Sequence, residues 1–204
     1  MTATLWIGTN NHKKLVELRR LLEPLGFTLR TPADLGRPYE PIEDQPDFAG
    51  NARKKAELLA RLAGGFAVAD DSGLCVDALG GRPGVLSARY GGPGLDDAQR
   101  VRRLLDELRD LPAEQRTAHF TCSLCVCAPD GSVRAAIEET CEGVLRTAPT
   151  GAGGFGYDPI FVPREFADAP ECSFATLDVA TKDRLSHRGK ALRRLAGELS
   201  RLLG

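Results

Sequence analysis

The stretch AVADDSG (residues 67–73) places two adjacent carboxylates directly after an apolar run. A short apolar run of this kind is typical of a buried strand. Neighbouring side chains on a strand point to opposite faces of the sheet, so both carboxylates can serve one site only where the strand ends and the backbone turns. We therefore expect the strand to end at Asp70, with Gly73 supplying the turn. Ligands of α/β sheets bind at such strand ends.

The carboxylate pair, Asp70 and Asp71, also indicates which ligand to expect. Two carboxylates this close repel each other and shift each other's pKa. A divalent cation removes that cost, and Mg²⁺ binds one or two carboxylates together with water and substrate phosphates. The alternative is a helix cap, in which Asp71 or Ser72 caps a following turn. A cap explains one aspartate and not both, so the pattern favours a metal and phosphate site.

Segments on both sides of this stretch alternate between strand and helix patterns. Two short strands (4–8 and 27–31) flank a helix with leucines at helical spacing, and a second helix covers 48–65. Further along, 96–111 predicts a third helix and 181–204 an amphipathic C-terminal one. Two β-rich runs flank Pro129-Asp130-Gly131, which is a strong hairpin signal. We expect one α/β domain over 1–204, with a mixed sheet and two lobes around a cleft.

The composition narrows the classes of function. With 42% hydrophobic and 27% charged residues, the chain of 204 residues can bury a substantial core. Its net charge of -1 gives no overall field that attracts nucleic acid or a membrane surface. No apolar run approaches the roughly 20 residues that span a bilayer. We therefore expect neither nucleic acid nor a membrane as partner, and, because the start lacks a secretory signal, a cytoplasmic protein.

Cys122, Cys125 and Cys127 form the pattern CSLCVC inside an apolar run. A metal knuckle needs a second pair of cysteines or histidines at suitable spacing, and none is obvious in the sequence. Six cysteines in a chain of this length do not resemble a disulfide scaffold either. We expect these residues to be buried free thiols.

Two predicted helix starts carry lysines. The first is GTNNHKKLVE (residues 8–17), and the second contains Asn51, Lys54 and Lys55. Free N–H groups and the helix dipole make a helix N-terminus an anion site, whereas cations there oppose the dipole. A bound anion such as a phosphate would favour both arrangements. The alternative for each is an ordinary capped helix with solvated lysines.

The last polar cluster combines GAGGFGYDP (residues 151–159) with SHRGKAL (residues 186–192). The glycines permit close approach of the backbone to a ligand, and Phe155 and Tyr157 between them could stack on a planar ring. Asp158 could accept hydrogen bonds from ring N–H groups. The alternative is a glycine-rich turn followed by a normal helix start. The remaining candidate donors are Ser186, His187 and Arg188.

Together these stretches resemble the inosine triphosphate pyrophosphatase family, which clears non-standard purine nucleoside triphosphates. The family pattern F-x-x-N-A-x-x-K-A is met by residues 48–56, and D-D-S-G-L-x-V-D-A-L-x-G-x-P-G-x-x-S-A-R-Y by residues 70–90. GGFGYDPIF and KDRLSHRGKAL match the base-pocket motifs, and the resemblance runs from about residue 5 to 200. The N-terminal pattern T-G-N-x-x-K-x-x-E is met by Thr9, Asn11, Lys14 and Glu17, with Asn10 where the family often has Gly.

The resemblance implies a long mixed β-sheet flanked by helices, two lobes with a central cleft, and a homodimer. It implies Mg²⁺-dependent hydrolysis of ITP, dITP or XTP to the monophosphate and pyrophosphate. Glu43 and Asp71 would hold Mg²⁺, and Asp70 or Asp71 would act on the attacking water; which does so stays open. Lys14, Lys55 and Lys182 would bind the phosphates. The full set of expected substrate-binding residues is Thr9, Asn10, Asn11, Lys14, Lys55, Ser72, Phe155, Gly156, Tyr157, Asp158, Lys182, Ser186, His187 and Arg188.

Two other functions remain open at this point. One is a related pyrophosphatase that acts on pyrimidine or modified bases. The other is a nucleotide-binding module without turnover, against which the acidic set of Glu43, Asp70 and Asp71 argues, because a sensor needs no acid that activates water.

Overall fold

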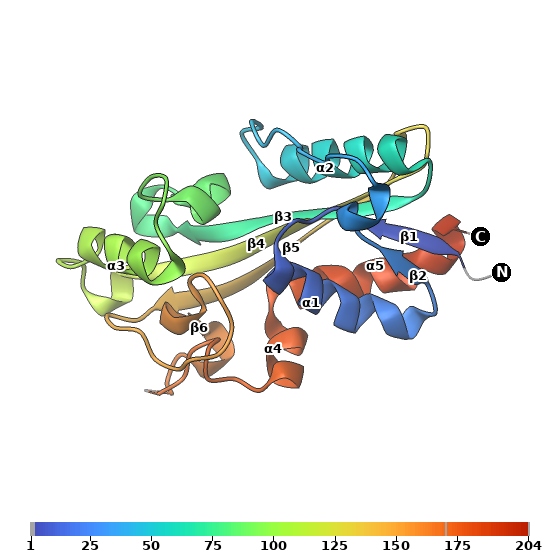
Figure 1. Ribbon diagram of the computed structural model, residues 1–204. Helices are drawn as coiled ribbons and strands as arrows, with labels where there is room; N and C mark the ends of the chain where they lie inside the picture. The colour runs from blue at the N-terminus through green and yellow to red at the C-terminus, as the bar shows by residue number, and fades with distance from the viewer. Residues whose placement is uncertain (1–2, 170, 204) are drawn as a thin grey trace. The chain divides into compact units, whose positions relative to one another are not determined.

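The computed structural model describes residues 3–169 and 171–203 of the chain (Figure 1). Its strands form one mixed sheet in the order β2-β1-β3-β4-β5-β6. β1 pairs in parallel with both β2 and β3, whereas β5 and β6 are antiparallel. The mixed α/β fold expected from the sequence is therefore confirmed. The strands are β1 (Thr4–Ile7), β2 (Thr28–Arg30), β3 (Ala67–Val76), β4 (Thr117–Cys127), β5 (Val133–Leu145) and β6 (Phe161–Pro163).

The chain divides into two compact units. The first comprises Met1–Asp71, Cys122–Glu139 and Arg188–Gly204, and the second comprises Ser72–Thr121 and Thr140–His187. β3, β4 and β5 each contribute residues to both units. The single domain with a central cleft stays a prediction. The helices are α1 (His12–Leu22), α2 (Phe48–Ala63), α3 (Asp97–Glu107), α4 (Val179–Leu185) and α5 (His187–Leu203).

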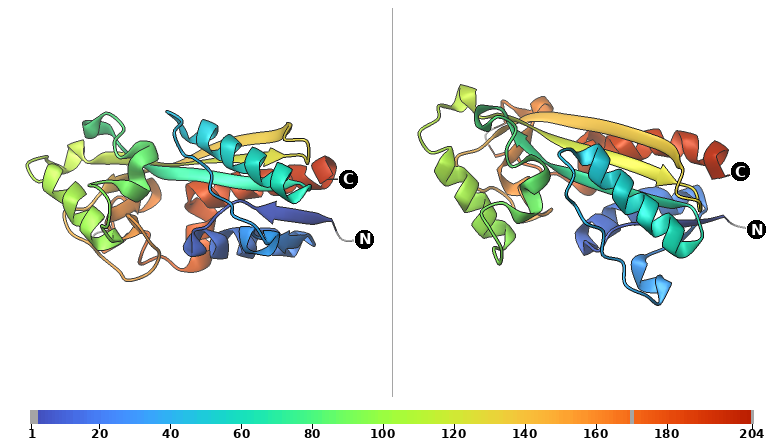
Figure 2. Two further views of the ribbon diagram at one scale, coloured as in Figure 1. Left: turned by 45° about the horizontal axis from the view of Figure 1, so that its top comes forward. Right: turned by 90° about the horizontal axis from the view of Figure 1, so that it is seen from above.

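In the first unit, helices cover both faces of the sheet, with α2 on one face and α1 and α5 on the other (Figures 1 and 2). The side chains follow the two-residue alternation of a strand. On β3, Ala67 and Ala69 pack with the α2 cluster, while Val68 packs with the cluster that includes α1 and α5 residues. On β1, Trp6 faces α2. Each face of this part of the sheet therefore has its own apolar core.

The helix ends follow local sequence signals. The Asn11 side chain accepts hydrogen bonds from the first turn of α1, and Asp47 accepts one from Gly50 N in α2. Gly64 ends α2 in the left-handed conformation, at φ +62°. Asp96 caps α3 in a capping box with Gln99. These helices match the expected ones, although α3 ends at Glu107, earlier than expected.

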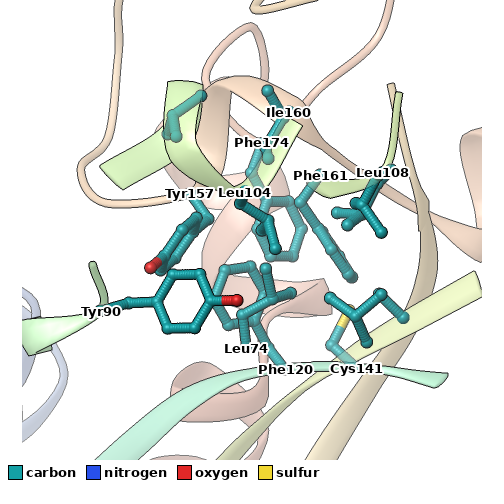
Figure 3. Packing of buried hydrophobic residues seen from close by; sticks show 14 of the residues in the cluster. Leu74, Tyr90, Leu104, Leu108, Phe120, Cys141, Tyr157, Ile160, Phe161 and Phe174 are labelled. Atoms are coloured by element: carbon teal, nitrogen blue, oxygen red, sulfur yellow. The ribbon is translucent and has the colours of Figure 1, made fainter. Parts of the chain in front are cut away.

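The second unit is built around an aromatic core (Figure 3). The rings of Phe120 and Phe161 meet edge to face with centroids 4.7 Å apart, and Phe161 and Phe174 lie 4.9 Å apart. Such pairs add about 0.5–1.5 kcal/mol beyond the area they bury. Leu104 of α3 and Leu108, the residue that follows this helix, complete this core. The unit thus has its own hydrophobic centre.

Two expectations about local structure are wrong. β3 does not end at Asp70: it continues to Val76, so Asp70 and Asp71 both lie within the strand, and Gly73 makes no turn. The expected single C-terminal helix is broken at Ser186, whose extended backbone (φ -65°, ψ 149°) separates α4 from α5. A helical pattern continues across this residue, so leucine spacing alone did not reveal the break.

Two other expectations, the hairpin and the buried free thiols, are confirmed. β4 and β5 are adjacent strands joined through residues 128–132, where Gly131 N donates to Ala128 O at 2.8 Å, as the hairpin signal predicts. All six cysteines are free and buried. Among the described residues, no helix has both the length and the apolar character needed to cross a bilayer.

Removal of a core side chain in the second unit tests its packing. Leu104 is 0% exposed, so Leu104→Ala should lower the free energy of unfolding by about 2–5 kcal/mol, because it removes buried methyl groups and leaves a cavity. Leu86 in the same unit is 45% exposed, and Leu86→Ala should change stability by less than about 0.5 kcal/mol. Urea unfolding measures both. Equal losses would contradict the core assignment.

Candidate active site

The adjacent aspartates lie beside the end of β1. The last residue pair between β1 and β3 joins Ile7 to Val68, and Gly8 N still donates to Val68 O at 2.7 Å. Beyond this point the chain leaves β1 and enters α1, whereas β3 continues to Val76. The strand that ends next to Asp70 and Asp71 is therefore β1, the neighbour of the strand that carries them. Ligand sites of α/β sheets generally lie at strand ends, and a strand end leaves space for the site here too.

Asp70 points to the face covered by α1 and α5. Its Oδ2 lies 3.1 Å from Lys14 Nζ and accepts hydrogen bonds from Arg188 Nε at 3.3 Å and Nη2 at 3.1 Å. The other side of the Arg188 guanidinium donates from Nη1 to Glu17 Oε2. Asp70 is 1% exposed and Arg188 3% exposed, so these charges depend on one another for solvation.

The cations keep Asp70 ionised. Burial by itself raises the pKa of this carboxyl, but the charges of Lys14, Arg188 and Lys55 oppose it and hold the pKa well below its usual range. The carboxylates of Asp70 and Glu17 likewise raise the pKa of Arg188, against the effect of its burial. Asp70 is therefore a permanent counter-ion that fixes Lys14 and Arg188.

Asp71 points to the opposite face, toward α2. Lys55 Nζ lies 3.0 Å from Asp71 Oδ1 and 2.8 Å from Glu43 Oε1. Asn51 Nδ2 donates to Asp71 Oδ2 at 3.1 Å, and Asn51 Oδ1 accepts from Gln45 N at 3.0 Å. Asn51 and Lys55 share one helix face because they are four residues apart. That spacing is visible in the sequence and could have identified Asn51, which we did not include among the expected site residues.

The pKa of Asp71 moves in the direction opposite to that of Asp70. Burial raises the pKa of Asp71, and the opposing charges of Lys55 and Lys14 do not cancel this effect. Burial lowers the pKa of Lys55, but the charges of Asp71, Asp70 and Glu43 raise it by more than burial lowers it. The ammonium therefore stays charged. Neighbouring carboxylates whose environments move their pKa values apart are suited to different roles. Asp71 is the better proton acceptor of the two.

Glu43 and Asp71 fit the expected Mg²⁺ ligands. Both carboxylates converge on one cation, the Lys55 ammonium, although they come from a loop and a strand far apart in the sequence. Mg²⁺ needs only one or two carboxylates when water and substrate phosphates complete its shell. Within residues 3–169 and 171–203, no group of three or more His, Cys, Asp and Glu is arranged to hold a metal by itself. The donor set thus suits an ion shared with a substrate.

The residues before α1 shape the approach to Lys14. Asn11 Oδ1 accepts from Lys13 N at 3.0 Å and from Lys14 N at 3.2 Å, and Thr9 Oγ1 accepts from Asn11 N at 3.1 Å. Asn10 Nδ2 donates to Tyr39 O at 3.3 Å. The Asn11 cap fixes the first turn of α1, which carries Lys14.

The second unit contains the expected base-pocket residues of the glycine loop. Asp158 Oδ2 accepts from Phe155 N at 2.7 Å and pairs with Lys182 Nζ at 2.7 Å. The same ammonium lies 5.2 Å from the centre of the Phe155 ring, close enough for a cation–π contact. A Cβ at position 154 would lie 2.1 Å from Asp158 Oδ2. Because Gly154 also has a φ of +70°, only glycine fits there. Gly156 N donates to Asp97 Oδ2 at 3.0 Å.

The structure corrects the expected role of the Tyr157 ring. Tyr157 is 4% exposed and belongs to the aromatic core, and its hydroxyl donates to Ser87 O at 3.1 Å (Figure 3). This ring therefore has no open face on which a ligand could stack. Phe155 is half-buried and keeps that possibility.

The expected donors at the start of α5 are buried. The His187 ring is 6% exposed and stacks on Phe120, with centroids 4.8 Å apart, and Ser186 is 4% exposed. Arg188 pairs with two carboxylates, as described above, so its expected contact with a base edge stays a prediction. The first unit holds Thr9, Asn10, Asn11, Lys14, Glu43, Lys55, Asp70, Asp71 and Arg188, and the second holds Ser72, Phe155, Gly156, Tyr157, Asp158, Lys182, Ser186 and His187.

Fold and site together define an α/β protein whose mixed sheet carries a lysine paired with a buried aspartate on each face of one strand. The chain belongs to the Ham1 family, which it matches over residues 5–198. It is 43% identical over 197 residues to the dITP/XTP pyrophosphatase of Rhodopirellula baltica, covering 97% of this chain and 93% of that protein. The same name is given to a relative from Gloeobacter violaceus, 45% identical over 98% of this chain and 96% of its own length. The structure of a HAM1 protein from Coxiella burnetii matches with a TM-score of 0.84 at 33% identity, covering 98% of this chain and 100% of that one.

The opposite pKa shifts predict different effects of two similar substitutions. Asp70→Asn removes the partner of the buried Arg188 and the partly buried Lys14, and should lower the free energy of unfolding by about 3–5 kcal/mol at pH 7. Asp71→Asn should cost less, because burial raises the pKa of this carboxyl and so makes its ionised form less favourable in the fold than that of Asp70. Chemical denaturation at pH 7 measures both, and a larger loss in Asp71→Asn would contradict the assignment.

The pH dependence of the Asp70→Asn effect tests the direction of the pKa shift of Asp70. The folded pKa of Asp70 lies below its ordinary value of 3.8, so its ionised form stabilises the fold at neutral pH, and this contribution begins to decrease as the pH falls below about 4. The stability difference between wild type and Asp70→Asn should therefore shrink as the pH approaches 3. A difference that grows with acidity would show that Asp70 is not held ionised.

Proposed function

We propose that this chain hydrolyses non-standard purine nucleoside triphosphates, such as dITP, XTP and ITP, to the monophosphate and pyrophosphate. The observation that carries the proposal is the convergence of Glu43 and Asp71 on Lys55, with Lys14 held by Asp70 on the other face of β3. Acidic and basic groups arranged in this way suit a metal ion and a polyphosphate. The names of relatives more than 40% identical over nearly the whole chain support the same reaction.

Cleavage between the α- and β-phosphates gathers negative charge on phosphoryl oxygens, so catalysis depends mainly on positioning and electrostatic stabilisation. Lys14 and Lys55 supply fixed positive charges in the first unit, and Lys182 supplies one in the second. Each is already oriented by a carboxylate: Asp70 holds Lys14, Asp71 and Glu43 hold Lys55, and Asp158 holds Lys182. Such preorganised charges need little rearrangement when the substrate binds.

Mg²⁺ would be held by Glu43 and Asp71, and when bound it would neutralise phosphate charge and increase the acidity of a water molecule. Asp71 is also the candidate acceptor of the water proton, because it pairs with Lys55 whereas the Asp70 carboxylate pairs with both Lys14 and Arg188. Asp70 is a positioning residue in this proposal, because its carboxylate is bound to Lys14 and Arg188. The two adjacent aspartates therefore divide counter-ion and proton-acceptor roles between them.

In the proposed base site, Phe155 stacks on the purine while Asp158, Ser186, His187 and Arg188 surround its edge. A 6-keto purine accepts a hydrogen bond at position 6, whereas adenine donates one there. Donors at this edge would leave the amino group of adenine unmatched, at a cost of about 1–3 kcal/mol for each buried mismatch. This difference would favour inosine and xanthine nucleotides over ATP.

The homodimer remains a prediction from the family resemblance. The cytoplasmic location, and the expectation that neither nucleic acid nor a membrane is a partner, also remain predictions, whereas the nucleotide is the partner that this function requires.

A triphosphate panel tests the function directly. With Mg²⁺ present, ITP, dITP and XTP should each yield monophosphate and pyrophosphate, and ATP should react much more slowly. Asp71→Asn should abolish turnover while the protein stays folded, because it removes the proposed water acceptor. Asp44→Asn is the control, since Asp44 is an exposed carboxylate next to Glu43 in the sequence. Release of a nucleoside diphosphate and inorganic phosphate, or tight binding of ITP without any product, would contradict the proposal.

Phe155→Ala tests stacking. Loss of base stacking costs about 1–3 kcal/mol, so KM for ITP should rise roughly 5- to 150-fold. Phe155→Tyr keeps a ring and should retain a KM near that of the wild type. If both variants keep the wild-type KM, Phe155 does not stack on the base.

A further inference from the structure

Asn51 is a buried polar side chain to which the proposed reaction assigns no role. It is 0% exposed and lies near the start of α2, four residues before Lys55. A buried amide is tolerated where hydrogen bonds satisfy its polar atoms. Both ends of the Asn51 amide meet this condition, and each end contacts a different part of the candidate site.

The oxygen of this amide fixes the loop that carries Glu43. Gln45 N, two residues after Glu43, donates to Asn51 Oδ1 at 3.0 Å. The loop also packs closely against α2, since a Cβ at position 50 would lie 2.8 Å from Gln45 Cβ. A backbone hydrogen bond to a fully buried acceptor restricts the loop next to the Glu43 carboxylate. Asn51 is therefore a buried anchor of this loop.

The nitrogen of the amide decides which oxygen of Asp71 faces the proposed metal site. Asn51 Nδ2 donates to Asp71 Oδ2 at 3.1 Å. Asp71 Oδ1 instead lies 3.0 Å from Lys55 Nζ, the ammonium that Glu43 also contacts. The two ends of the amide cannot be exchanged, because Gln45 N can only donate and an ionised carboxylate can only accept. Asp71 Oδ1 and the Glu43 carboxylate are thus directed to the same place.

Asn51 differs from Lys55 because it can keep its contacts when ligands bind. Lys55 holds the same two carboxylates, but it does so as a cation. Its ammonium would be repelled by Mg²⁺ at these carboxylates and attracted by substrate phosphates. A neutral amide is not subject to either force. Hydrogen-bonded partners behind the ligands orient ligating carboxylates in this way in metal sites generally.

We propose that Asn51 is a positioning residue that holds Glu43 and Asp71 in the arrangement that binds Mg²⁺. Its Oδ1 acts through the loop backbone, and its Nδ2 acts on Asp71 directly. The inference rests on the proposed function, because that function makes Glu43 and Asp71 the metal ligands.

Metal binding tests this role. Mn²⁺, a paramagnetic substitute for Mg²⁺, is titrated into protein saturated with the non-hydrolysable α,β-methylene analogue of ITP, and free Mn²⁺ is measured by electron paramagnetic resonance. Asn51→Ala should weaken Mn²⁺ binding roughly 10- to 100-fold, because it removes a partner that orients both ligands.

Asp44→Ala is the matched control for this titration. It breaks the Asp44–Lys54 ion pair, which joins the same loop to the same helix at 2.6 Å but has exposed side chains. Exposed ion pairs of this kind contribute little, so Mn²⁺ binding should stay at the wild-type level. Wild-type binding in Asn51→Ala, or an equal loss in Asp44→Ala, would overturn the proposal.

Hydrogen exchange in the metal-free protein tests the loop contact without any ligand. In Asn51→Ala, the Gln45 amide should exchange roughly fivefold faster or more, because it loses its acceptor. Amides in the middle of α2 should keep their protection, which shows that the variant is folded. An unchanged exchange rate at Gln45 would overturn the anchoring role. A wild type that hydrolyses no triphosphate would instead contradict the proposed function, and Mn²⁺ binding and exchange would still decide the positioning role.

Asn51→Asp separates the two ends of the amide at nearly constant side-chain volume. Its carboxylate still accepts from Gln45 N, so exchange at that amide should stay near the wild-type rate. Its other oxygen cannot replace the donor to Asp71, and two carboxylates this close repel each other. kcat for ITP at saturating Mg²⁺ should fall roughly tenfold or more, with little change in KM. A wild-type kcat would show that Nδ2 does not orient Asp71.

Discussion

The two-residue alternation of side chains along β3 is the constraint on which the rest of this site depends. Because Asp70 and Asp71 are neighbours within an unbroken strand, their carboxylates must point to opposite faces of the sheet. Each then meets a different helix and a different lysine: Lys14 from α1 on one face and Lys55 from α2 on the other. One dipeptide thereby connects the two helix starts that carry the lysines.

Burial makes this arrangement costly as well as functional. Charges taken out of water are tolerated only where partners compensate them, and Asp70 has two cationic partners for one carboxylate. Asp71 has a smaller surplus of positive charge, because Lys55 also pairs with Glu43. The difference separates the pKa values of the two aspartates, and it is the physical basis for giving them separate roles. A polyphosphate with its metal ion would add charges of both signs to this balance.

The glycine loop of the second unit shows the same use of preorganisation. Asp158 holds both the backbone of Phe155 and the ammonium of Lys182, and the absence of a side chain at Gly154 makes room for it. Tyr157, two residues from Phe155, is instead part of the aromatic core. Tyr157 therefore anchors the loop, and the Phe155 ring remains available to a ligand.

The sequence by itself determined the mixed α/β class, the hairpin and the family, because these depend on local periodicity, turn chemistry and motif spacing. It also placed Asp71, Lys55 and Glu43 in one predicted site. Only the tertiary structure decided that β1, not β3, ends beside Asp70, and that Arg188 pairs with this carboxylate. Strand ends, burial and long-range ion pairs depend on which neighbours the fold supplies, and no local pattern contains that information. The 3.8 Å contact between the Sγ atoms of Cys125 and Cys127 is another feature that only the tertiary structure shows. Their shared strand face fixes the direction of both side chains, but packing sets the distance between them.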